Sequence, residues 1–278
     1  MVSRRRVVQS GVLVPGATLL SGCATSTVSP VSTATSRSTY VLVPGAWHGG
    51  WCWDEVRSLL EANGHRVYTP SLSGLGDRVH YNKDKEIGLE THINDVVNLI
   101  KFEELEDVIL VGHSYAGVVI SGVVDRVKDS IAQLVYLDAI IADDAGSLVD
   151  PYGELSDQQV GQIMADVVLD NDRSLPVPGL GFLGLDENHP LADSLLQRLT
   201  PHPAKTITDR LRYMNDGPAG VAKSFIYCTE QKQDSVISRK LKKIKNNEEW
   251  SYLEIATSHE AMLTEPRQLV ELLYQITA

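Results

Sequence analysis

The chain has 278 residues, of which 43% are hydrophobic and 22% charged, and a formal net charge of −11. This composition is typical of a globular protein with one sizeable core, so one domain carrying an insertion is favoured over two equal domains. The acidic balance argues against nucleic acid as a partner and favours a neutral small-molecule substrate.

The first 22 residues have the parts of an export signal. Three arginines, Arg4–Arg6, precede a short apolar run and a group of small residues before Cys23. The arginine pair resembles a twin-arginine signal, and residues 20–23 resemble a bacterial lipoprotein box. We therefore expect export to the bacterial cell envelope or periplasm. Lipidation of Cys23, with anchoring to a membrane, and a tail without export function both stay open.

The remainder of the chain predicts a flexible tether followed by alternating strands and helices. Residues 23–38 are rich in Ser and Thr, as in a tether. Short apolar runs then alternate with helical patterns, which indicates βαβ units and a parallel sheet. In chain order we expect a strand at 40–43, a helix around 56–60, a strand at 66–69, a helix at 93–100, a strand at 107–111, a helix at 117–127, strands at 133–137, 223–228 and 250–255, and a last helix with Thr264 as its N-cap and Pro266 in its first turn.

The alternation breaks between residues 141 and 218. This stretch has helical fragments, several Pro and Gly residues, and no clear strand. We expect it to be a helical cap over one end of the sheet, with residues 39–140 and 219–278 forming the core.

Ser114 lies in the sequence Gly112-His113-Ser114-Tyr115-Ala116, between a predicted strand and a predicted helix. Gly-x-Ser-x-Gly in that context is a nucleophile elbow, a sharp turn that exposes the serine hydroxyl. Ala116 replaces the second glycine of the motif. The pattern predicts Ser114 as a nucleophile, whereas a glycine-rich turn without chemistry is the alternative.

An oxyanion hole for this nucleophile needs two backbone N–H donors. One follows the nucleophile, at Tyr115, and the other comes from the loop after the first strand, where Ala46 is the candidate. His48 lies in that same loop and is a conceivable base. We assign it to loop packing instead, together with Trp47 and its neighbouring tryptophans.

The serine also requires a general base and an orienting carboxylate. His259 follows the last predicted strand on a short loop, which is the place of the base in the chain order serine, acid, histidine. The acid should follow the strand that ends near Cys228, and Asp234 is our first candidate. Glu230 and Asp138 are alternatives, and each of the three carboxylates could instead cap a helix or lie in solvent.

At these residues the chain resembles the α/β-hydrolases that include plant methylesterases, plant hydroxynitrile lyases and related bacterial esterases. The resemblance covers about residues 39–278. The matching stretches are 41–53, 72–78, 89–93, 112–114, 200–203 and 258–263. It implies an α/β-hydrolase fold, a mostly parallel doubly wound sheet with a helical cap inserted after the sixth strand, and the same triad and backbone donors.

Departures from the family bear on the reaction. Family members often have His at the place of Pro44. The lyases carry Thr at the place of Gly45 and Lys directly after the catalytic histidine, where this chain has Glu260. Lyase chemistry uses that lysine to stabilise departing cyanide, so its absence favours ester hydrolysis.

We therefore predict a serine-dependent carboxylic ester hydrolase that acts on small to medium apolar or aromatic esters through an acyl-enzyme. No metal or cofactor is implied. A hydroxynitrile-type lyase and a non-catalytic ligand receptor are the rival functions. Cys52 and Cys228 pair in an oxidising compartment or remain buried thiols. The oligomeric state stays open, a homodimer included.

Overall fold

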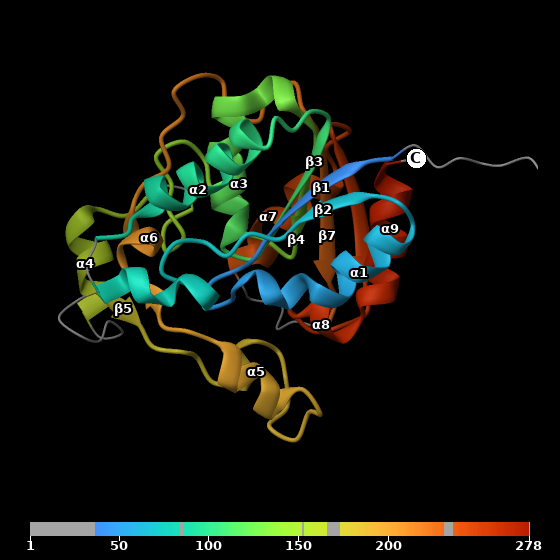
Figure 1. Ribbon diagram of the computed structural model, residues 1–278. Helices are drawn as coiled ribbons and strands as arrows, with labels where there is room; N and C mark the ends of the chain where they lie inside the picture. Colours follow the sequence, from blue (N-terminus) through green and yellow to red (C-terminus); the bar gives the residue numbers. More distant parts are fainter. Residues whose placement is uncertain (1–36, 84–85, 152, 166–172, 231–235, 278) are drawn as a thin grey trace, which may run out of the picture. The chain divides into compact units, whose positions relative to one another are not determined.

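Six parallel strands form the central sheet in the order β2-β1-β3-β4-β7-β8 (Figure 1). Their bounds are β1 Thr39–Val43, β2 Arg66–Tyr68, β3 Val108–His113, β4 Ile131–Leu137, β7 Ala222–Cys228 and β8 Trp250–Ile255. Each pairing within this sheet is parallel in the described part of the chain. The carboxyl ends of the strands therefore meet at one edge, and the predicted parallel α/β fold is confirmed.

The structure is a computed structural model, and it describes residues 37–83, 86–151, 153–165, 173–230 and 236–277. The predicted export signal, Cys23 and nearly all of the predicted tether lie outside these residues. So does Asp234. Among the residues described, no helix is long and apolar enough to cross a membrane.

Nine helices lie in the described part of the chain. They are α1 Asp54–Ala62, α2 Leu89–Phe102, α3 Ala116–Val127, α4 Asp157–Ala165, α5 Ala192–Arg198, α6 Lys205–Thr208, α7 Val236–Lys245, α8 Ala261–Thr264 and α9 Pro266–Thr277. The helix predicted at 117–127 begins one residue earlier, at Ala116. Figure 1 shows α2 beside α3, and α1 beside α9.

The core has two apolar layers because strand side chains alternate between the two faces of the sheet. In β1, Val41 and Val43 pack with α2, α3 and α7. The intervening Tyr40 and Leu42 pack with α1, α8 and α9 on the other face. All six residues of β3 are buried, as expected for a central strand covered on both sides. Helices packed on both faces of the sheet thus fix the positions of the carboxyl ends of its strands.

The cap occupies the connection between β4 and β7 and differs from the prediction in two respects. It follows the fourth strand of the described chain, not the sixth, because only β1 to β4 precede it. It is also not purely helical. Ser174–Leu175 (β5) pairs antiparallel with His202–Pro203 (β6), and these strands are too short to give a periodic pattern.

Candidate active site

Ser114 lies directly after β3 and before α3, with a backbone φ of +54°. This left-handed conformation is costly for a residue with a Cβ and marks a strained turn. Its amide donates to the Leu137 carbonyl at 3.1 Å, and its carbonyl accepts from the amides of Gly117 and Ile140. Neighbouring strand ends therefore hold the strained serine from both sides.

Small residues make this turn geometrically feasible. A Cβ at Gly112 would lie 2.8 Å from the carbonyl oxygen of Ala116, and one at Gly117 would collide with the carbonyl oxygen of Ile140. Ala116, the departure from the glycine pattern, is fully buried. The close approach that requires a missing side chain falls at Gly117, one residue later.

His259 connects the serine to a carboxylate. Its Nε2 lies 2.8 Å from Ser114 Oγ, and its Nδ1 lies 2.6 Å from Asp138 Oδ2. The carboxylate accepts a hydrogen bond from Nδ1–H, which leaves Nε2 free to accept the proton of the serine hydroxyl. Asp138 is fully buried and His259 is 7% exposed, so this relay is shielded from water.

The geometry corrects the predicted acid. Asp234, our first candidate, lies outside the described residues. The hydrogen bond of His259 Nδ1 is made to Asp138. Glu230 is exposed at the surface. Asp138 follows β4 immediately, and β4 lies beside β3, so the two strand ends deliver the carboxylate and the serine to neighbouring positions. The position of Asp138 directly after a predicted strand was the signal in the sequence. The chain order serine, acid, histidine led to Asp234 instead, because Asp234 follows the next core strand.

The surroundings of His259 tune its charge. Burial lowers the pKa of His259, but the hydrogen bond and charge of Asp138, helped by Glu260, outweigh burial and raise it above the ordinary value. His113 packs beside it, with ring centroids 4.5 Å apart. Burial and then repulsion from His259 lower the pKa of His113 to about 3. A neutral His113 donates from Nε2 to the His259 carbonyl at 2.8 Å and fixes its backbone.

Two backbone amides are placed to stabilise an oxyanion. Within the described residues, the N–H groups of Ala46 and Tyr115 have no hydrogen-bond acceptor. Tyr115 follows the nucleophile, and a Cβ on Gly45 would lie 3.0 Å from Ser114 Cβ. The loop after β1 therefore packs directly beside Ser114. Free amides beside a nucleophile are the donors that a developing oxyanion requires.

The loop histidine His48 is buried and is not the base. Its Nδ1 lies 2.8 Å from the Ala46 carbonyl oxygen, and its Nε2 lies 3.3 Å from Glu260 Oε2. Cys52 and Cys228 are buried free thiols, so the structure does not pair them. Across the described ranges, no group of three or more His, Cys, Asp or Glu residues is arranged to hold a metal ion.

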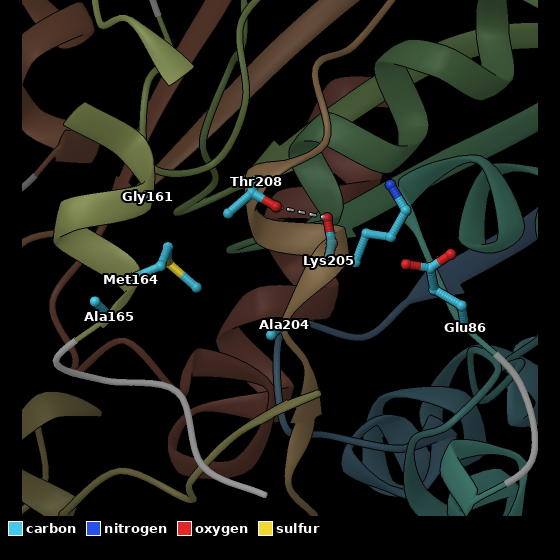
Figure 2. Close-up of a pocket in the computed structure, with 7 residues that line it drawn as sticks. All are labelled: Glu86, Gly161, Met164, Ala165, Ala204, Lys205 and Thr208. Carbon is cyan, nitrogen blue, oxygen red and sulfur yellow. Dashed lines mark hydrogen bonds between the residues drawn. The ribbon is translucent and has the colours of Figure 1, made fainter. Parts of the chain in front are cut away.

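A separate cavity of about 440 Å³ lies in the cap between α4 and α6 (Figure 2). Figure 2 shows Lys205 and Glu86 on one side of it and Met164 with Ala165 on the other. None of its lining residues belongs to the triad or to the oxyanion loop. This cavity is therefore distinct from the catalytic relay.

A serine in a strained turn, a buried histidine–aspartate pair and two free amides at the strand ends define the class of α/β serine hydrolases. Residues 40–272 match the family model described as the alpha/beta hydrolase family, and the chain belongs to that family.

Comparisons with known proteins agree with this class. The chain is 37% identical over 240 residues to the carbendazim hydrolyzing esterase of Nocardioides sp. (strain SG-4G), covering 84% of this chain and 96% of that protein. It is 28% identical over 255 residues to methylesterase 3 of Arabidopsis thaliana, covering 85% and 94%. A solved extracellular alpha/beta-hydrolase from a Paenibacillus species superposes with a TM-score of 0.70 at 26% identity, covering 86% and 99%.

Proposed function

We propose that the protein is a carboxylesterase that hydrolyses esters through a covalent acyl-enzyme. One observation carries this conclusion: the continuous relay from Ser114 Oγ through the ring of His259 to Asp138, with contacts of 2.8 and 2.6 Å. A nucleophile, a base and an orienting carboxylate in this order perform acyl transfer on many unrelated folds. The related proteins named as esterases support the same activity.

The reaction has two balanced steps. His259 takes the proton from Ser114 while Oγ forms a bond to the ester carbonyl carbon, and the amides of Ala46 and Tyr115 hold the resulting oxyanion. The intermediate collapses, the bond to the leaving oxygen breaks, and His259 protonates the departing alkoxide. A water molecule then gives a proton to His259 as its oxygen forms a bond to the acyl carbon. This second intermediate collapses, the bond from the acyl carbon to Ser114 Oγ breaks, and His259 returns its proton to Oγ. The products are a carboxylic acid, an alcohol and the free enzyme.

The carboxylate after His259 disfavours the rival lyase reaction. Glu260 is fully buried. Burial raises its pKa, but His48, His113 and His259 together outweigh burial and bring the pKa of Glu260 down to about 2. An anion at this place repels a departing cyanide ion, whereas a cation would stabilise it. We therefore retain hydrolysis as the function.

We further propose small to medium apolar or aromatic esters as substrates, methyl esters among them. Trp47 follows the oxyanion donor Ala46 and contacts two apolar clusters of the cap. Its ring meets that of Phe182 edge to face at a centroid distance of 5.6 Å, and Phe182 is 68% exposed. Exposed aromatic surface beside an active-site loop favours an apolar ligand. The names of the methylesterases and of the carbendazim hydrolyzing esterase support this class.

The activity can be tested with p-nitrophenyl acetate and butyrate. Wild type should hydrolyse both, and Ser114→Ala should lower kcat by about 10⁴-fold or more. Ser194→Ala, which alters an exposed serine of the cap, should retain full activity. A fluorophosphonate should label Ser114 at one equivalent, as located by mass spectrometry. Cleavage of mandelonitrile without ester hydrolysis would instead support a lyase, and ligand binding without turnover a receptor.

Substrate class and location each have their own measurement. A panel of methyl, short-chain, long-chain and aromatic esters, with carbendazim included, should show the highest kcat/KM for small apolar or aromatic members. We also propose export to the cell envelope, with Cys23 as a candidate lipid anchor, on the basis of residues 1–23. The mass of the N-terminal peptide of protein purified from its host would show whether this segment is removed and whether Cys23 carries lipid.

A further inference from the structure

The peptide group that joins Ala46 to Trp47 is held at both of its polar atoms. Its carbonyl oxygen lies 2.8 Å from His48 Nδ1, and its N–H donates to His202 Nδ1 at 3.2 Å. The next carbonyl, that of Trp47, accepts from the Thr200 amide at 3.0 Å. Since this peptide follows the Ala46 N–H directly, holding it restricts rotation at Ala46 and so the direction of the donor.

The backbone at this point needs such support. Trp47 has a φ of +66°, a left-handed conformation that disfavours bulky residues. Conformations of this kind persist when the surrounding contacts over-determine them. Here the contacts come from both sides: His48 belongs to the loop itself, and Thr200 and His202 belong to the cap.

His202 is fixed by its own partners. It is fully buried in β6, and its Nε2 lies 2.6 Å from Thr206 Oγ1. The Thr206 hydroxyl donates to the Pro203 carbonyl at 2.7 Å, so it accepts the Nε2 proton. His202 is therefore the neutral tautomer with Nδ1 free to accept the Trp47 N–H. A protonated ring would lose that acceptor.

The same ring contacts the residue of the second oxyanion donor. The rings of His202 and Tyr115 meet edge to face at a centroid distance of 4.9 Å. The Tyr115 hydroxyl donates to His92 Nδ1 at 3.0 Å, and His92 Nε2 donates to the Ser73 carbonyl at 2.8 Å. His202 thus holds Trp47, the residue after the donor Ala46, through a hydrogen bond and Tyr115, the second donor residue, through ring packing.

We propose that His202 is a positioning residue for ester hydrolysis: from the cap, it orients the backbone of the oxyanion loop through the Trp47 amide and buttresses Tyr115. This inference rests on the proposed function, because an oxyanion hole matters only if the serine attacks a carbonyl. It gives the cap a part in the chemistry in addition to covering the site. A histidine that only filled space in the core would affect stability and leave turnover unchanged.

Two substitutions separate these roles. His202→Asn keeps an acceptor at the place of Nδ1 and loses the bond to Thr206, whereas His202→Leu keeps bulk and loses both bonds. The matched control is His189, another cap histidine, whose Nδ1 accepts the Leu191 amide at 3.2 Å away from the oxyanion loop. His189→Leu and His189→Asn provide the comparison pair.

The expected result is a loss of kcat that the acceptor rescues. At a temperature well below unfolding, His202→Leu should lower kcat for p-nitrophenyl butyrate by about 10²-fold with little change in KM, the size of effect expected from a displaced donor. His202→Asn should recover at least about tenfold of this loss, and the His189 pair should match wild type. Equal kcat in wild type and folded His202→Leu, or equal losses in the Asn and Leu variants, would overturn the proposal.

A second measurement does not depend on activity. In protein labelled with ¹⁵N-tryptophan, the Trp47 amide should exchange slowly with solvent in wild type and at least about tenfold faster in His202→Leu, with the other tryptophan amides unchanged. An unchanged exchange rate at Trp47 would contradict the proposed role of His202 in holding this amide. If wild type lacks esterase activity but shows this exchange pattern, the proposed function is contradicted, whereas the bond between His202 and the Trp47 amide is still supported.

Discussion

His48 and Glu260 form a buried imidazole–carboxylate pair behind the catalytic histidine, with His48 Nε2 lying 3.3 Å from Glu260 Oε2. Their exposed fractions are 1% and 0%, and among the described residues the carboxylate has no well-directed hydrogen bond. Burial raises the pKa of Glu260, yet the opposing charges of His48, His113 and His259 bring it down to about 2. A full negative charge therefore lies next to His259 throughout the working pH range.

This charge should shift the acid limb of the pH profile, in addition to the larger effect of Asp138. His259 acts as a base only when neutral, so kcat/KM falls as the pH drops through its pKa, which is raised above 6.5. Glu260→Gln removes one of the anions that favour the imidazolium form. The midpoint of the acid limb should therefore move to lower pH. Profiles from pH 5 to 9 measure the shift.

Glu265→Gln is the matched control, because Glu265 is an exposed carboxylate at the end of α8. Its acid limb should coincide with that of wild type. If the Glu260→Gln and wild-type limbs coincide as well, the carboxylate does not act on the base.

Breaking the pair on one side should cost stability. His48→Leu leaves the Glu260 carboxylate buried without its imidazole partner, and the free energy of unfolding at pH 7 should fall by about 3–5 kcal/mol. Adding Glu260→Leu removes the stranded charge, so the double variant should be more stable than His48→Leu alone. Urea unfolding of the four members of the cycle measures the coupling energy. Additive single effects would refute the coupling.

The same pair has a defined pH window for stability. The folded pKa of Glu260, about 2, lies below the ordinary 4.5, so its ionised form stabilises the folded state fully above about pH 4.5. The contribution is lost as the pH falls from 4.5 toward 2. The difference in unfolding free energy between wild type and Glu260→Gln should therefore shrink across this interval. A constant difference would mean that the carboxylate does not titrate there.

The identity of the acid can be tested by three isosteric changes. Asp138→Asn should lower kcat by about 10³–10⁴-fold, because an amide no longer favours the Nδ1–H tautomer or the imidazolium that forms. Glu230→Gln should leave kcat unchanged, since Glu230 is exposed at the surface. Asp234→Asn should also leave it unchanged. A large loss in Asp234→Asn with a small loss in Asp138→Asn would restore the first sequence-based choice.

Gly45 should not tolerate a side chain. A Cβ there would lie 2.8 Å from His113 Nδ1 and 3.0 Å from Ser114 Cβ. Gly45→Ala should lower the free energy of unfolding by about 1–3 kcal/mol. It should also lower kcat, since the loop that carries Ala46 must shift. Gly179→Ala, where a Cβ meets nothing within 4 Å, is the control and should behave as wild type in both measurements. A stable, fully active Gly45→Ala protein would contradict the crowding.

Local sequence patterns were sufficient for the parts of the site that depend on one segment. The elbow around Ser114 is a short-range motif, and His259 follows the last strand of an alternating series, so both could be proposed before the sheet was assembled. Strand positions were predictable for the same reason, because buried parallel strands are continuous apolar runs. The parallel α/β fold followed from their alternation with helices.

The acid and the cap contacts depend on how distant segments meet. Asp138 follows the end of β4, and the other candidate acids follow the end of β7. Spacing along the chain does not tell which of these two strand ends lies beside His259 Nδ1. His202 lies between two prolines in the sequence, with no local pattern that indicates a partner, and its bond to the Trp47 amide joins residues 155 positions apart. The two-residue strands of the cap owe their pairing to tertiary packing and leave no periodicity in the sequence.

The cap enters and leaves the core at fixed points, between Asp138 and β7, which would make it attractive to transplant between relatives when altering specificity. The bonds from Thr200 and His202 to the Trp47 backbone limit where such a graft can be cut. A chimaera that replaces residues 141–199 keeps this attachment with the host sequence. A graft that extends to residue 218 also replaces Thr200 and His202. The grafted cap would then have to supply a matching donor and acceptor for the Trp47 backbone, which belongs to the host.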